Sequence, residues 1–153
     1  MHLAQLNIAH LKYPIDDPRM ADFVGNLDRI NALAERSPGF VWRLKDGGGN
    51  ATQIPLDDDP MVIPNMSVWE SAEALEQFVW ATVHQQIYNR KAEWFVPQDQ
   101  ATFVMWWIEE GHTPNLVEAR DRLEYLRAHG DTDEAFGWSH LPHVKLWQEK
   151  RCG

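Results

Sequence analysis

The order in which two hydrophobic periodicities follow one another most constrains the fold of this chain. Residues 2–11 alternate with the period of two that is typical of a β-strand, whereas residues 17–36 carry apolar side chains at helical spacing. Strand patterns recur at 40–44, 61–69 and 102–109, and helical patterns recur at 72–95 and 114–130. The predicted order is therefore strand, helix, strand, strand, helix, strand, with one more helix at the end.

This order predicts an α+β domain of the ferredoxin-like βαββαβ type, with a four-stranded antiparallel sheet and an extra C-terminal helix. Within the third strand, Pro64 predicts an edge position or a bulge, because proline cannot donate a hydrogen bond to a neighbouring strand. The long helix is expected to be kinked around Thr82, and Glu118 and Arg122 have the i,i+4 spacing of an ion pair.

The length of 153 residues fits one domain, which we place at 1–138, followed by a C-terminal tail at 139–153. The formal net charge of −9 disfavours nucleic acid and anionic membrane surfaces as partners, since both repel a negative protein. The sequence contains no long apolar run, and its first residues lack the features of an export signal. Its single cysteine, Cys152, is compatible with a reducing compartment, so a cytoplasmic location is expected.

Aromatic content predicts self-association. Two helices can cover only one face of a four-stranded sheet, and the chain has 8 Trp and 6 Phe, including Trp106 and Trp107 on a strand. So much apolar area is unfavourable in water on both sides of the sheet. We therefore expect a homodimer in which the two sheets face one another.

Several motifs carry a family resemblance. The stretch Val68-Trp69-Glu70-Ser71, followed by Ala74, Leu75 and Phe78, resembles the strand-to-helix junction of the dimeric α+β barrel superfamily, which includes antibiotic-biosynthesis monooxygenases and haem-degrading monooxygenases. Further matching positions lie between His84 and Phe136, and include Arg90, Trp94-Phe95, Trp106-Trp107-Ile108, Gly111-His112, Pro114, Glu118-Ala119, Arg122-Leu123, Leu126, Gly130 and Thr132. Together they resemble the domain-of-unknown-function family 3291 over residues 3–138. The resemblance implies a fold and a dimer but no reaction, and the acidic segment Asp57–Asp59 and the tail depart from it.

His84 and Tyr88 are the strongest candidates for catalytic residues, because their spacing of four places them on one face of the predicted helix. Histidine titrates near neutral pH and suits a general base, a proton shuttle or a haem ligand. The alternative is that His84 makes a structural hydrogen bond at the expected kink.

Arg90 and Trp94 share the same spacing, so the guanidinium is expected to stack on the indole or to pair with a carboxylate. Such a clamp would either join helix to sheet or bind an anionic ligand group. On the first strand, Gln5 and Asn7 share a face, where amides can hold a carbonyl or enolate oxygen of a substrate, as the resemblance implies, or can satisfy one another.

Three functional hypotheses follow. The first is a homodimer that binds a small hydrophobic or aromatic molecule. As an enzyme it would be a cofactor-independent monooxygenase in which His84 moves a proton, Asn7 and Gln5 hold oxyanion charge, and the indoles exclude water. Those indoles are Trp69, Trp94 and Trp106. The second hypothesis is a haem-binding or haem-modifying protein with His84 as axial ligand. The third is a dimeric binding module without catalysis.

Overall fold

We analysed a computed structural model of the chain, which describes residues 1–45, 59–83 and 90–141. The acidic segment around Asp58, the predicted pair His84 and Tyr88, and the tail from residue 142 lie outside the described residues. Predictions that rest on these positions therefore stay predictions.

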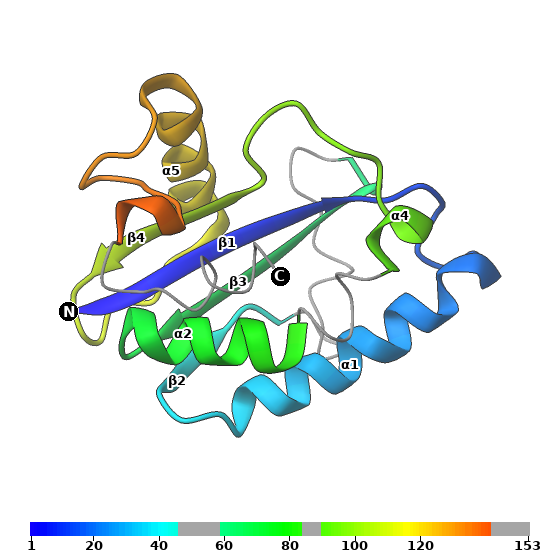
Figure 1. Ribbon diagram of the computed structural model, residues 1–153, viewed down its shortest axis with the longest axis horizontal. Coiled ribbons are helices and arrows are strands. Elements are labelled where there is room, and N and C mark those ends of the chain that lie inside the picture. The colour runs from blue at the N-terminus through cyan, green and yellow to red at the C-terminus, as the bar shows by residue number, and fades with distance from the viewer. Residues whose placement is uncertain (46–58, 84–89, 142–153) are drawn as a thin grey trace.

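The described elements follow the expected order (Figure 1). The strands are β1 (His2–His10), β2 (Phe40–Arg43), β3 (Val62–Trp69) and β4 (Phe103–Ile108). The helices are η1 (Pro18–Met20), α1 (Ala21–Glu35), α2 (Ala72–Phe78), the π-helical segment η3 (Val79–Val83), α4 (Lys91–Trp94), α5 (Leu116–His129) and η5 (Trp138–His140).

Local signals account for several of these boundaries. The side chain of Asp17 caps η1, and Asn115 caps α5 by accepting a hydrogen bond from the Glu118 amide at 2.9 Å. Gly130 ends α5 with φ +74°, a conformation that favours glycine. The predicted kink near Thr82 corresponds to η3, where the helix changes to π geometry.

Among the described residues, no helix combines the length and the apolar character needed to cross a membrane.

The four strands form one antiparallel sheet in the order β2-β3-β1-β4, which confirms the α+β, ferredoxin-like fold class. Strand β3 is an inner strand, so the edge position predicted from Pro64 is wrong, and the register irregularity lies instead in β2, between Phe40 and Trp42. Pro64 is tolerated because it pairs with Ile8 on β1, while the described residues of β2 pair with β3 from Ser67 to Trp69, and the Leu44 amide donates to the Met66 carbonyl just beyond. The missing N–H group therefore lies where β3 extends beyond β2.

The two faces of the sheet are covered by different helices (Figure 1). Odd-numbered residues of β1 point toward α1 and α2, and Leu3 packs there with Leu75 and Ala34. Even-numbered residues point toward α5, where Leu6 packs with Ala119 and Leu123. We call these two sides the α1/α2 face and the α5 face.

Because α5 covers its face, the premise of the expected sheet-to-sheet dimer is not met. The sheet residues there are buried within the single chain, with Leu6, Val104 and Trp106 each 0% exposed. Two sheets could meet on this side only if α5 left it. A homodimer thus stays a prediction, but the sheet no longer requires a second copy as its cover.

Candidate functional site

Four polar side chains occupy the middle of the α1/α2 face. Gln5 and Asn7 come from β1, and Ser67 and Asn65 lie directly opposite them on β3. We call these four residues the polar strip. It separates two apolar clusters on the same face, one containing Leu3 and Trp69 and the other containing Leu11 and Ile63. A band of amides and a hydroxyl between two cores is unfavourable unless its members find partners.

Most of the strip is joined in one hydrogen-bond network. The amide nitrogen of Gln5 donates to Ser67 Oγ at 2.7 Å and to Asn65 Oδ1 at 3.1 Å. The indole nitrogen of Trp69 donates to the same Ser67 oxygen at 2.9 Å. Gln5 and Ser67 are 5% and 7% exposed, so this network forms the buried floor of the strip. A buried and connected network of this kind fixes its side chains in place.

Asn7 differs from its neighbours because its side chain is exposed. It lies on an inner strand, and every other residue from Leu3 to Ile8 is buried. Among the described residues, no side-chain hydrogen bond joins Asn7 to the network. Helices that cover the α1/α2 face elsewhere therefore leave solvent access at its centre, at the polar strip.

Aromatic rings stand on both sides of the strip. Trp69 stacks on Phe78 with a centroid distance of 5.1 Å, at the end where Ser67 lies. Phe103 pairs with Asn7 across the strands and stacks on Trp138 at 5.6 Å. The strip thus offers hydrogen bonds at its floor and flat apolar surfaces beside it, which is the composition of many small-molecule sites.

The structure brings together only some of the predicted site residues. Gln5, Asn7 and Trp69 lie on the same face and are part of, or bonded to, the polar strip. Trp106 pairs with Ala4 and packs against α5, so it lies on the opposite face of the sheet and cannot line this site. The prediction that it shares a cavity with Gln5 and Asn7 is wrong, because neighbouring positions of a strand point to opposite faces.

Arg90 and Trp94 form the expected stack, with the guanidinium carbon 4.6 Å from the indole centroid. The guanidinium also pairs with Glu93 at 2.8 Å and with Asp22 of α1 at 3.1 Å. The hydrogen bonds that Arg90 donates to Glu93, and then to Asp22, raise the pKa of Arg90. With two carboxylates and a buried indole as partners, Arg90 acts here as a clamp between α4 and α1. Its predicted role as a ligand anchor stays a prediction.

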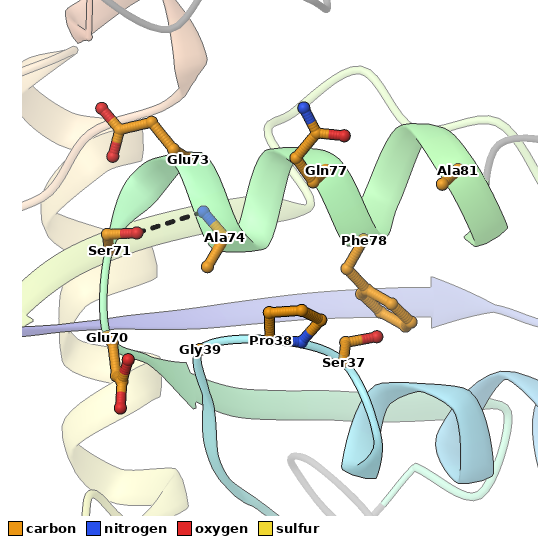
Figure 2. Close-up of a pocket in the computed structure, with 10 residues that line it drawn as sticks. All are labelled: Ser37, Pro38, Gly39, Glu70, Ser71, Glu73, Ala74, Gln77, Phe78 and Ala81. Atoms are coloured by element: carbon orange, nitrogen blue, oxygen red, sulfur yellow. Dashed lines mark hydrogen bonds between the residues drawn. The ribbon is translucent and has the colours of Figure 1, made fainter.

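A groove lies between α2 and the turn that connects α1 to β2, and it shares Phe78 with the ring stack beside the strip (Figure 2). Its volume is about 570 Å³, and Figure 2 shows the ring of Phe78 extending from α2 toward Ser37 and Pro38. The hydroxyls in it have structural partners: Ser37 donates to the Leu33 carbonyl at 2.8 Å, and Ser71 accepts from the Ala74 amide at 3.2 Å. The other polar groups of the groove are Glu70, Glu73 and Gln77, so its lining is acidic, whereas the strip is neutral and its polar groups are fixed by buried hydrogen bonds.

Two members of the strip, Asn65 and Ser67, were missed in the sequence. The pattern Ile63, Asn65, Ser67, Trp69 alternates as Gln5 and Asn7 do, but its register against β1 decides whether the polar positions meet. The strands pair with Gln5 opposite Ser67 and Asn7 opposite Asn65. The sequence signal that could have revealed them is the spacing of two between Asn65 and Ser67, which repeats that of Gln5 and Asn7.

Comparison with known proteins identifies a family. The model of the family described as Domain of unknown function (DUF3291) matches residues 2–152. The chain belongs to this family. The match extends beyond the expected 3–138 and includes both the acidic segment and the tail.

This DUF3291 chain also resembles a protein of known structure. No curated protein matches the chain. Among solved structures, it resembles a protein from Chloroflexus aurantiacus J-10-fl that is provisionally described as an antibiotic biosynthesis monooxygenase. The identity is 16%, the TM-score is 0.47, and the match covers 74% of this chain and 98% of the other.

Proposed function

We propose that this DUF3291 chain binds a small hydrophobic or aromatic molecule at the polar strip. The observation that carries the proposal is the exposed Asn7 on an inner strand of a helix-covered face, beside the buried network of Gln5 and Ser67. Amides at the centre of a sheet lower the stability of the fold compared with apolar residues, and hydrogen bonding to a ligand would explain why they are there. The stacked rings beside the strip suit the apolar part of such a ligand.

The test is a titration with 2-naphthol, a neutral aromatic probe, followed by tryptophan fluorescence. We expect saturable binding that Asn7→Leu weakens by on the order of tenfold, because leucine keeps the shape of asparagine and loses its hydrogen bonds. Gln77→Leu is the matched control: it also replaces an exposed amide by leucine, but Gln77 lines the groove of Figure 2. Binding that Gln77→Leu weakens and Asn7→Leu leaves intact would place the ligand in the groove and reject the proposal.

The finer proposal is that the bound molecule is oxidised without a cofactor, as in a monooxygenase. Its support is that fixed hydrogen-bond donors at the strip can stabilise an enolate oxygen once a proton has been removed. Anthrone is a suitable probe: loss of a C10 proton gives an enolate, and reaction with O₂ yields anthraquinone and water. The predicted base is His84, and Tyr88 is the second residue of the predicted pair. Oxygen uptake that His84→Ala and Asn7→Leu both abolish would support turnover, and its absence in the wild type would leave a binding module.

The haem hypothesis depends on His84 as the iron ligand, and this residue lies outside the described ones. No observation on the described residues favours haem over another planar aromatic molecule, so we keep haem as a prediction. Haemin titration of the wild type and His84→Ala tests it directly. A Soret shift that the substitution abolishes would assign the ligand.

A further inference from the structure

The hydrogen-bond directions in the polar strip specify which chemical group a ligand must present. Ser67 Oγ accepts two hydrogen bonds, one from the Gln5 amide nitrogen and one from the Trp69 indole nitrogen. A hydroxyl oxygen has two lone pairs, so both are in use. An indole N–H can only donate, which fixes the direction of at least that bond.

The hydroxyl hydrogen of Ser67 is therefore left to be donated. Among the residues that the structure describes, none of the hydrogen bonds takes it up. Asn65 is in a related position: its carbonyl oxygen accepts from Gln5, so its NH₂ group is turned away from that bond. Since both groups are bonded to the same Gln5 nitrogen, they lie close together. Beyond the network, this part of the strip presents donors.

Charge narrows the choice of acceptor. The polar strip and the two ring stacks beside it contain no charged side chain, and Ser67 is 7% exposed. A carboxylate placed there would lose its hydration without gaining a cation from these described side chains, which is costly in a buried site. A neutral carbonyl accepts the same hydrogen bonds at much lower cost. An ammonium or other pure donor gains nothing from Ser67 and Asn65, and the acceptors of the strip are the carbonyl oxygens of Gln5 and Asn7.

We infer that the ligand of the polar strip is an aromatic compound with a neutral carbonyl group, whose oxygen accepts hydrogen bonds from Ser67 and Asn65. This inference rests on the proposed function and deepens it. The aromatic part would lie against the stacked rings, and Asn7 would line the entrance.

Three naphthalenes of nearly equal size test the inference: 2-acetylnaphthalene, its planar isostere 2-isopropenylnaphthalene, and 2-naphthoate. We expect the ketone to bind at least about tenfold more tightly than either of the others, because only it offers a neutral acceptor. Equal affinities of the ketone and the isostere would overturn the inference, as would a preference for 2-naphthoate. Failure of all three to bind would overturn it too.

Two variants test whether the preference for the ketone depends on Ser67 and Asn65. Ser67→Ala should lower ketone affinity by on the order of tenfold and leave that of the isostere unchanged. Because Ser67→Ala also removes the acceptor of Trp69, Asn65→Asp serves as the second variant: it keeps the oxygen that accepts from Gln5 and replaces the NH₂ donor. A ketone preference that survives in both variants would overturn the inference. The 2-naphthol titration with Asn7→Leu is independent of these results, since 2-naphthol both donates and accepts, so the proposed function can stand when the carbonyl preference fails.

Discussion

His10, at the end of β1, is expected to make stability depend on pH. Its Nε2 atom is buried and has no hydrogen-bond partner among the described residues. Burial, and then the positive charge of Arg127, lower the pKa of His10, while Asp59 acts in the opposite direction. The folded chain therefore binds this proton less readily than the unfolded chain, whose histidine titrates near the usual value of about 6.5.

It follows that protonation of His10 has no effect on stability above about pH 6.5 and lowers the free energy of unfolding as the pH falls below that value, until the folded form also takes up the proton. We expect His10→Gln to lose less stability between pH 7.5 and pH 5.5 than the wild type in urea unfolding. The other six of the 7 histidines are present in both proteins, so the comparison isolates His10. Parallel pH profiles would contradict the prediction.

At the scale of elements, one carboxylate adds a buried hydrogen bond to the apolar contacts that Ala119 and Leu123 of α5 make with the sheet. Glu118 accepts a hydrogen bond from the indole of the fully buried Trp106 at 2.8 Å, and its other oxygen lies 2.7 Å from His112 Nε2. Glu118→Ala should lower the free energy of unfolding by about 1–3 kcal/mol, because it leaves a buried indole N–H without an acceptor.

The control is Glu124→Ala on the same helix, where an exposed ion pair with Arg127 is lost and the effect should stay below about 1 kcal/mol. Both substitutions replace glutamate by alanine in a helix, so helix propensity cancels in the comparison. Equal losses of stability in urea unfolding would show that the bond to Trp106 does not anchor α5.

The same helix shows what local pattern can and cannot predict. Spacing alone predicted an ion pair between Glu118 and Arg122, but Glu118 turns to Trp106 and His112, and Arg122 pairs with Glu134 at 3.2 Å. Partners at i,i+4 are weak, and a buried donor competes for the carboxylate successfully. Element order, by contrast, was predictable, because periodicity and breakers such as Asp17 and Gly130 act within the segment itself.

Predictions about the site succeeded where they depended on alternation within one strand and failed where they depended on how strands pair. Gln5 and Asn7 could be assigned to one face from alternation, whereas Ser67 and Asn65 required the register of β3 against β1, and Trp106 required the face of β4. Register and facing depend on how distant segments pack, which no local window contains. The cover of the second face by α5 is likewise a tertiary property, and it removed the argument for a sheet-to-sheet dimer.

At the scale of the whole molecule, the remaining question is how a homodimer would be built. Because α5 is anchored over the apolar side of the sheet, a dimer that keeps α5 in place must use another surface. Such a dimer should dissociate equally in the wild type and in Glu118→Ala. A dimer formed by two sheets requires α5 to leave, so it should become tighter when the bond to Trp106 is removed.

Light scattering over a range of protein concentrations separates these cases. We expect a mass of twice the 17.8 kDa chain, with the same dissociation constant for both proteins. A tighter dimer in Glu118→Ala would show that α5 competes with the second sheet for one face, and the barrel implied by the family resemblance would then be the open form of this chain. A mass of one chain at every concentration, in both proteins, would contradict the homodimer and leave the polar strip as a site completed within a single copy.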